Sequence, residues 1–233
     1  LFFIIVTANG ITNLHVVQIT LLLLCCSWLS WGFITAVFGM VSRLRAEPRP
    51  LRPDYVPQDK TAILVPVYNE DAEAVYARVA AMIEGLTSID RLEHFHVHVL
   101  SDSTKAECVA EERRGHSALL TRLSLAGRLF YRHREKNTGR KAGNIADFVT
   151  RNGGAYAYML VLDADSLMAP DTILEMVARM DDDPELALLQ TQPLIINRRT
   201  IFGRALQFSA ALFSPVFSRG IAALQGREGP FWG

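Results

Sequence analysis

The chain has 233 residues, is 50% hydrophobic and carries a formal net charge of zero. This length suits one domain of ordinary size with an additional segment. Zero net charge without a long basic run excludes the electrostatic signature of nucleic-acid binding, so we expect no nucleic-acid partner. The chain has three cysteines, which form no disulfide framework and no CxxC pair, so we expect no structural zinc site.

The N-terminal part is strongly apolar. Residues 16–42 are almost free of charge and are long enough for a bilayer span, which needs about 20 apolar residues. We therefore predict a transmembrane helix over 16–42. Residues 1–8 look like the tail of an earlier span, with 9–15 as a short periplasmic loop. Because the chain starts at a leucine without an initiator methionine, we expect a fragment that begins inside that span.

Residues 43–59 are basic and rich in proline, which predicts an extended juxtamembrane linker. The basic residues at the exit of the predicted span are Arg43, Arg45, Arg49 and Arg52. The positive-inside rule therefore predicts that the following domain lies in the cytoplasm.

The pattern of residues 60–233 predicts a globular domain. Its strands and helices alternate, and this alternation favours a wound, mostly parallel α/β sheet. Short apolar runs predict strands at 61–65, 95–100, 129–131, 158–162 and 186–191. Between them we expect helices, including a polar one over 104–125 that is weakened at Gly115 and one from about Pro170 to Met180. The acidic run 181–183 predicts a solvated helix end. The apolar segment 202–224 predicts a surface packed on the membrane or on other parts, broken at Pro215.

The stretch from Leu160 to Ser166 joins a predicted buried strand to two carboxylates, Asp163 and Asp165. Residues two apart in an extended backbone point to the same side. Both carboxylates then face one point, where one or two carboxylates and substrate phosphates hold Mg²⁺. The alternative is an acidic turn after a strand, and Asp-x-Asp taken alone favours that alternative.

Polar residues follow four of the predicted strands: Asn69 and Glu70, Asp102, the loop with Lys141, and Asp163 with Asp165. In a parallel sheet these strand ends lie on one rim, where ligands of open α/β sheets bind. Acceptors such as Glu70 and Asp102 suit a base and ribose, and Lys141 or Arg140 suits a diphosphate. The combination predicts a metal-assisted nucleotide-sugar site.

These motifs resemble those of a known family. The segments 66–70, 102, 141–144 and 163–165 resemble, in order, the motifs of processive glycosyltransferase family 2 enzymes with the GT-A fold. The segments 100–103, 136–144 and 162–166 resemble more closely the glucans biosynthesis glucosyltransferase H family. The resemblance covers essentially the whole chain, and the combination of motifs is highly specific.

The resemblance implies an inverting glucosyltransferase that transfers glucose from UDP-glucose to a growing β-glucan acceptor. It also implies a divalent metal, Mg²⁺ or Mn²⁺, and a multi-pass protein of the bacterial inner membrane with its catalytic domain in the cytoplasm. The glucan is then destined for the periplasm.

Site residues also follow from the resemblance, position by position. Those matching the surroundings of the uridine are Val67, Tyr68, Asn69, Glu70 and Asp102. Lys141 matches a lysine beside the diphosphate, and Trp232 matches an aromatic residue near the acceptor sugar. Asp163 is expected near the ribose or diphosphate of the donor, and Asp165 is expected to be the main metal ligand. Asp163 and Asp165 are then the catalytic carboxylates within this chain.

The chain departs from the family pattern at its end. The family's general base is an aspartate in a later acidic motif, which has no counterpart before Gly233. We therefore expect this fragment to bind donor without general-base chemistry. Two alternatives remain open: a related synthase of the cellulose, chitin or hyaluronan type, and a membrane module that binds nucleotide sugars without turnover.

A second group of candidate ligands is the alternating set His94, His96 and His98. Their spacing places the imidazoles on one face of a predicted strand, a pattern that suits a metal. They lie at the end of that strand away from Asp102, so we assign them no metal role.

Overall fold

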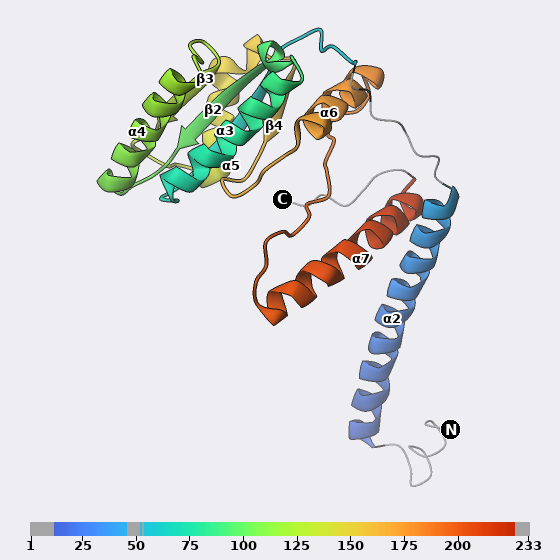
Figure 1. Cartoon of the computed structure of the whole chain (residues 1–233). Coiled ribbons are helices and arrows are strands. Elements are labelled where there is room, and N and C mark those ends of the chain that lie inside the picture. The colour runs from blue at the N-terminus through green and yellow to red at the C-terminus, as the bar shows by residue number, and fades with distance from the viewer. Residues whose placement is uncertain (1–11, 46–51, 53, 227–233) are drawn as a thin grey trace. The chain divides into compact units, whose positions relative to one another are not determined.

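The computed structural model describes residues 12–45, 52 and 54–226. It forms two compact units: Leu1–Arg49 together with Gln190–Gly233, and Pro50–Leu189 (Figure 1). All predicted site residues belong to the second unit except Trp232, which lies outside the described residues.

The second unit is built on a four-stranded sheet in which every neighbouring pair is parallel. The strands are β1 (Thr61–Val67), β2 (Phe95–Ser101), β3 (Leu129–His133) and β4 (Tyr158–Val161), in the spatial order β3-β2-β1-β4. This confirms the predicted wound, mostly parallel α/β fold. Because the strands point the same way, their carboxyl ends form one rim.

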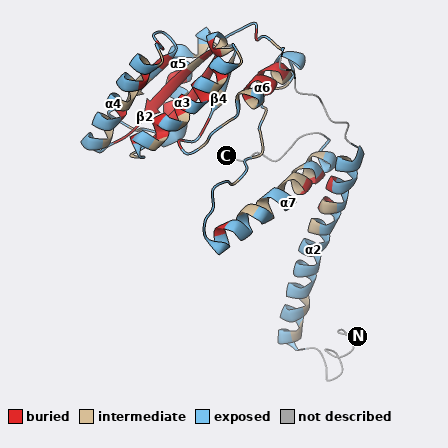
Figure 2. Ribbon diagram, in the orientation of Figure 1, coloured by how far each residue is buried: buried red, intermediate tan, exposed pale blue. Residues whose placement is uncertain are grey.

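Helices cover both faces of this sheet. They are α3 (Ala72–Ser88), α4 (Ala106–Arg122), α5 (Arg140–Asn152) and α6 (Pro170–Asp182), with short 3-10 turns η1 (Leu92–His94) and η2 (Gly153–Ala155). Ile63 and Val65 of β1 belong to one core with α3, α4 and α6, whereas Leu64 packs on Phe148 of α5. All seven residues of β1 are buried, as expected for a strand covered on both faces. Figure 2 shows similar burial along the neighbouring strand β2.

Helix α4 is continuous, so the predicted weakening at Gly115 is wrong. A Cβ built on Gly115 would overlap the ring of Tyr76 from α3. Tyr76 is 6% exposed, and its ring lies against Gly115 between the two helices. The missing side chain of Gly115 therefore allows α3 and α4 to approach each other.

We expect Gly115→Ala to destabilise the protein, although alanine in a helix is favoured over glycine by about 0.5–1 kcal/mol. The added methyl group overlaps Tyr76, and overpacking typically costs about 1–3 kcal/mol. Thermal unfolding of the full chain should show a lower midpoint. The control is Gly154→Ala, since a Cβ on Gly154 meets nothing within 4 Å. A midpoint for Gly115→Ala at or above that of the wild type would contradict this packing.

The strand predicted at 186–191 does not form: this segment has no regular secondary structure and pairs with none of the described strands. Leu188 within it is 62% exposed. An apolar run becomes a strand only when a neighbouring strand accepts its backbone hydrogen bonds, and the sequence pattern contains no information about that neighbour.

The face of the sheet covered by α5 carries two histidines. His96 and His98 both hydrogen-bond the hydroxyl of Tyr156, at 3.0 and 2.8 Å. The ring of His98 also stacks on Phe130, with 4.7 Å between ring centroids, and meets Phe148 edge-on. Their alternation therefore places both imidazoles in an aromatic cluster.

Burial, together with the nearby charges of His96 and Arg132, lowers the pKa of His98 from 6.5 to about 4. The unfolded chain thus gains a proton near pH 6.5 that the folded chain does not take up until about pH 4. Stability from this neutral histidine is complete above pH 6.5 and is lost as the pH falls towards 4.

We therefore expect the difference in unfolding free energy between wild type and His98→Gln to shrink as the pH is lowered from 6.5 to 4. Urea unfolding of both proteins across this range measures the difference directly, because the carboxylates common to both cancel. A difference that stays constant with pH would show that burial of His98 does not control its protonation.

The segment before β1 packs on the end of α6. Nη1 of Arg52 donates to Oδ2 of Asp182 at 2.7 Å, and the hydroxyl of Tyr55 donates to Asp181. The hydroxyl of Tyr158 donates to Oδ1 of Asp181 at 2.7 Å. The end of α6 is exposed, as predicted, but its aspartates also accept hydrogen bonds from Arg52 and Tyr55 of the segment before β1. The second unit accordingly begins at Pro50, ahead of the predicted start at residue 60.

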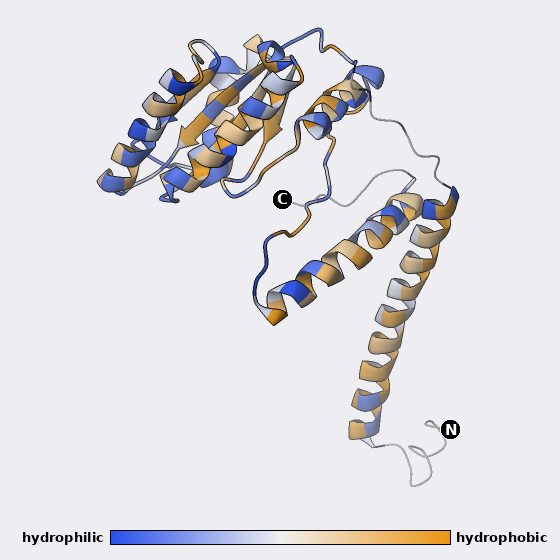
Figure 3. Cartoon of the chain, in the orientation of Figure 1, coloured by the Kyte–Doolittle hydropathy of each residue, from blue (hydrophilic) through white to orange (hydrophobic). Residues whose placement is uncertain are grey.

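The first unit contains the long helix α2 (Asn13–Arg45). Its 33 residues correspond to about 50 Å at 1.5 Å per residue, and its most apolar window has a mean hydropathy of 2.0. Figure 3 shows the apolar residues along its length. The helix is long and apolar enough to cross a membrane. It extends three residues beyond the predicted span at each end, so part of the predicted loop 9–15 is helical.

Helix α7 (Ile201–Leu224) packs on α2 within the same unit. The predicted break at Pro215 is wrong, because Pro215 lies inside the continuous helix. A Cβ on Gly39 of α2 would overlap the carbonyl of Val216, and a Cβ on Gly220 of α7 would overlap the carbonyl of Thr35. Glycine on each helix thus lets the two backbones approach closely, as small residues do between membrane helices.

Candidate functional site at the carboxyl rim of the sheet

The rim brings together the loops that follow β1, β2 and β4. The backbone N–H of Asp102, after β2, donates to the carbonyl of Val67 at 2.9 Å. The N–H of Leu162, after β4, donates to the carbonyl of Leu64 at 2.9 Å. The side chain of Val67 is buried in the core, so only the backbone of Val67 could contact the nucleotide as predicted.

Asp102 is held by an arginine that the sequence analysis missed. Nε and Nη2 of Arg134 donate to the two carboxylate oxygens of Asp102, each at 2.7 Å. Hydrogen bonding to Asp102 raises the pKa of Arg134. Only 6% of the Asp102 side chain is exposed. Asp102 is therefore one member of an ion pair with fixed geometry. Arg134 lies directly after β3, just as the predicted site residues lie directly after their strands.

The loop after β1 contains Tyr68, Asn69 and Glu70. Tyr68 is 51% exposed, and its N–H donates to the carboxylate of Glu70. Asn69 has a positive φ of 56°, a left-handed conformation that asparagine tolerates. Its Oδ1 accepts the N–H groups of Thr104 and Lys105 at 3.1 and 3.0 Å. The Asn69 side chain thus joins two rim loops, while Tyr68 and Glu70 are exposed.

The Asp-x-Asp segment has the predicted alternation. Leu162 and Ala164 are buried, and Asp163 and Asp165 are exposed, so both carboxylates face away from the core. The N–H of Ser166 donates to the carbonyl of Asp163 at 2.9 Å, which closes a turn immediately after the extended part. The segment is therefore both an exposed carboxylate pair and an acidic turn.

Lys141 reaches this segment from α5. Its Nζ forms an ion pair with Asp163, and the two side chains are 51% and 65% exposed. Lys141 lies in the first turn of α5, which begins at Arg140, so the predicted loop 137–144 is helical in its second half. Gly139 precedes the helix at a φ of 73°, and a Cβ on Gly143 would overlap the carbonyl of Thr138. Both glycines permit the tight entry that places Lys141 at the rim.

A second arginine missed by the sequence analysis holds the Asp-x-Asp segment. Nη1 of Arg78, in α3, donates to the carbonyl of Ala164 at 2.9 Å. Ala164 lies between the two aspartates, so this bond orients the backbone that carries both carboxylates. Nothing in the sequence signals it, because Arg78 and Ala164 lie far apart in the chain and α3 is polar on its outer face.

If the rim binds UDP with a divalent cation, as the family resemblance implies, Arg78→Ala should weaken that binding by the full-length protein about ten- to a hundredfold, because a lost hydrogen bond from a charged donor costs about 1.5–3 kcal/mol. Titration of UDP with and without Mn²⁺ measures this effect. Arg114→Ala is the control, since Arg114 is exposed and pairs only loosely with Glu111 at 3.8 Å. Equal UDP affinity in Arg78→Ala and the wild type would show that the carbonyl contact does not organise the carboxylates.

The donor atoms available at the rim fit a hard divalent cation. Asp163 and Asp165 offer carboxylate oxygens, and Mg²⁺ is commonly held by one or two carboxylates together with substrate phosphates. Among the described residues no group of three or more His, Cys, Asp or Glu side chains is placed to hold a metal. The residues therefore suit a cation that the substrate helps to bind.

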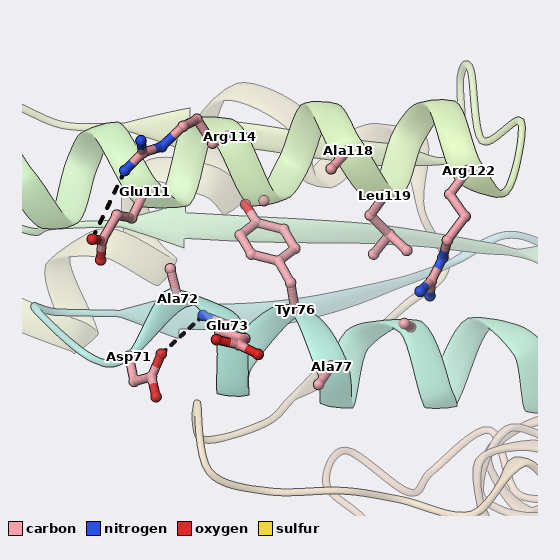
Figure 4. Close-up of a pocket in the computed structure, with 12 residues that line it drawn as sticks. Asp71, Ala72, Glu73, Tyr76, Ala77, Glu111, Arg114, Ala118, Leu119 and Arg122 are labelled. Atoms are coloured by element: carbon pink, nitrogen blue, oxygen red, sulfur yellow. Dashed lines mark hydrogen bonds and ion pairs between the residues drawn. The ribbon is translucent and has the colours of Figure 1, made fainter.

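A cavity of about 640 Å³ lies apart from these residues, between α3 and α4. Figure 4 shows Tyr76 between the two helices, with Asp71 just before α3, Glu73 on α3 and Arg114 on α4. None of the predicted site residues lines it. The predicted donor site is thus the exposed rim itself.

A parallel wound sheet with carboxylates, a lysine and a helix N-terminus at its carboxyl rim defines a class of nucleotide-binding α/β proteins. The family model described as glycosyl transferase family 2 matches residues 62–231. The chain belongs to this family, whose GT-A-like fold agrees with the observed sheet.

Curated relatives agree with the family. The chain is 46% identical over 227 residues to glucans biosynthesis glucosyltransferase H of Cereibacter sphaeroides, covering 97% of this chain and 38% of that protein. It is 45% identical over 202 residues to the protein of that name from Xylella fastidiosa (87% and 31% covered). It is 41% identical over 233 residues to that from Caulobacter vibrioides (98% and 35%). The chain thus spans about a third of the length of these relatives, and the predicted family resemblance is confirmed.

A mannosyltransferase from Pyrobaculum calidifontis, solved in complex with GDP-Man and Mn²⁺, is similar with a TM-score of 0.48 and 19% identity, over 68% of this chain and 43% of that chain. At this TM-score we draw nothing from the likeness.

Proposed function

We propose that the chain is the donor-binding part of an inverting bacterial glucosyltransferase that transfers glucose from UDP-glucose to a growing β-glucan. The observation that carries the proposal is the meeting of Lys141 with Asp163, beside Asp165, at the rim of a parallel sheet. The relatives named glucans biosynthesis glucosyltransferase H support the choice of glucose and of a glucan product.

In the proposed reaction, an acceptor hydroxyl forms a bond to the anomeric carbon while the bond from that carbon to the diphosphate breaks. The proton of the hydroxyl goes to a general base, which the family resemblance assigns to the aspartate of a later acidic motif. The electron pair of the broken bond leaves with UDP. Lys141 is placed to bind the diphosphate oxygens that gain charge, and its exposed pair with Asp163 is readily exchanged for phosphate. A bound divalent cation, Mg²⁺ or Mn²⁺, supplies further neutralisation of that charge, with Asp165 as its main ligand.

The nucleoside end of the donor is assigned to the neighbouring loops. Tyr68 is exposed and offers an aromatic face for the base. Glu70 is exposed and offers acceptor oxygens for hydroxyl groups. The fixed pair of Asp102 and Arg134 presents a donor and an acceptor side by side. Asn69 contributes by holding this loop in place. We retain Trp232 as the acceptor-side residue on the basis of the sequence resemblance.

We further propose that α2 spans the bacterial inner membrane in a multi-pass protein, with lipid covering its apolar surface. Only 6% of its most apolar window is buried within the protein. Arg43 and Arg45 lie in its last turn, which by the positive-inside rule places the second unit in the cytoplasm. UDP-glucose is then bound on the cytoplasmic side of the membrane.

We expect Asp165→Ala in the full-length protein to reduce glucan synthesis by about 10²–10³-fold or more, the range found when one group that stabilises transition-state charge is removed. Incorporation of labelled glucose into glucan by isolated membranes measures the activity, and the amount of variant in those membranes shows whether insertion is intact. The control is Asp59→Ala, an exposed aspartate outside the rim. Normal incorporation by Asp165→Ala would refute the assignment.

A further inference from the structure

Glu112 is a buried carboxylate that none of the proposed steps uses. It is 2% exposed, although Glu111, Arg113 and Arg114 beside it on α4 are exposed. Its Oε1 accepts from Oγ of Ser103 at 2.5 Å, and its Oε2 accepts from the hydroxyl of Tyr131 at 2.9 Å.

Both of these hydrogen-bond partners are neutral hydroxyl groups. A carboxylate buried among neutral groups costs free energy that a well-packed apolar side chain would not. Packing of α4 on the sheet would therefore favour an apolar side chain at position 112. The presence of a glutamate there has to be explained by its hydrogen bonds.

The direction of the hydrogen bonds extends the influence of Glu112 to the rim. The hydroxyl of Ser103 donates to Oε1 of Glu112, so its single proton points to Glu112 and the lone pairs of Oγ point elsewhere. The backbone N–H of Asn69 donates to this same Oγ at 2.7 Å. Glu112 thus fixes the rotation of the Ser103 hydroxyl group, which accepts a hydrogen bond from the backbone N–H of Asn69.

Asn69 needs such a fixed partner. Its positive φ of 56° is uncommon for a residue other than glycine and persists only where surrounding contacts determine it. The N–H that binds Ser103 and the Oδ1 that binds Thr104 and Lys105 hold this residue from both sides. On either side of Asn69 in the chain are the exposed residues Tyr68 and Glu70.

We propose that Glu112 is a positioning residue for the donor nucleotide, acting through Ser103 on the backbone of Asn69. It fixes the loop conformation in which Tyr68 and Glu70 face the nucleoside. This inference rests on the proposed function and assigns the affinity for the nucleotide partly to a residue that does not touch it.

The test is UDP binding and donor kinetics of the full-length protein with Glu112→Gln. Glutamine keeps the size of the side chain but removes its charge and puts a donor-only NH₂ group against one of the two hydroxyl groups, so the charge-assisted hydrogen bond from that hydroxyl is lost. We expect the Kd for UDP and the KM for UDP-glucose to rise about tenfold, with kcat within about twofold, since losing such a bond costs on the order of 1.4 kcal/mol.

Two further variants separate positioning from general damage. Glu111→Gln makes the same chemical change one residue earlier, on an exposed side chain, and should leave the Kd for UDP unchanged. Ser103→Ala should weaken UDP binding as much as Glu112→Gln does. The double variant should be no weaker than either single variant, because both substitutions interrupt one chain of hydrogen bonds.

A Kd for UDP in Glu112→Gln within twofold of the wild type would overturn the inference, as would additive effects in the double variant. If Glu112→Gln does not fold, Ser103→Ala alone decides, since it removes one hydroxyl group, and an unchanged Kd then overturns the inference. Failure of the wild type to bind UDP would instead contradict the proposed function, so the two failures are distinguishable.

Discussion

Parallel hydrogen bonding of β1 to both β2 and β4 is the constraint on which the rest of the second unit depends. Thr61 is aligned with Phe95 on one side and with Tyr158 on the other. With this register β1 and β2 end level with each other, at Val67 and Ser101, and β4 ends beside Leu64, so that the segment with Asp163 and Asp165 continues towards the same rim. The apolar character of β1 and its burial on both faces are what hold it at this central position.

The charges at the rim fall into two kinds. Asp102 and Arg134 form a nearly buried bidentate pair, with 6% and 14% of their side chains exposed, and such a pair is fixed in geometry. Lys141 and Asp163 form an exposed pair, which water screens and which contributes little to stability. The first pair shapes the site, whereas the second can exchange partners, which the proposed binding and release of a diphosphate requires.

Much of the second unit could be predicted from sequence, because its strands are short apolar runs that stop at polar residues. The run before Asp163 and the alternation that exposes Asp163 and Asp165 are examples. Two of the errors share one cause. The segment 186–191 has the composition of a strand but pairs with none of the described strands, and Gly115 is of a residue type that weakens helices but packs on Tyr76. In both cases a residue distant in the sequence decided the outcome.

The sequence by itself determined the family, the parallel sheet and the identity of the rim residues, because these depend on periodicity and on polar residues next to strand ends. Only the tertiary structure showed that Asp102 is paired with Arg134, that Arg78 donates to the carbonyl between the two aspartates, and that Ser103 links Glu112 to the backbone of Asn69 by hydrogen bonds. These contacts join side chains from different elements, and their geometry arises only when the packed helices bring those elements within hydrogen-bond distance.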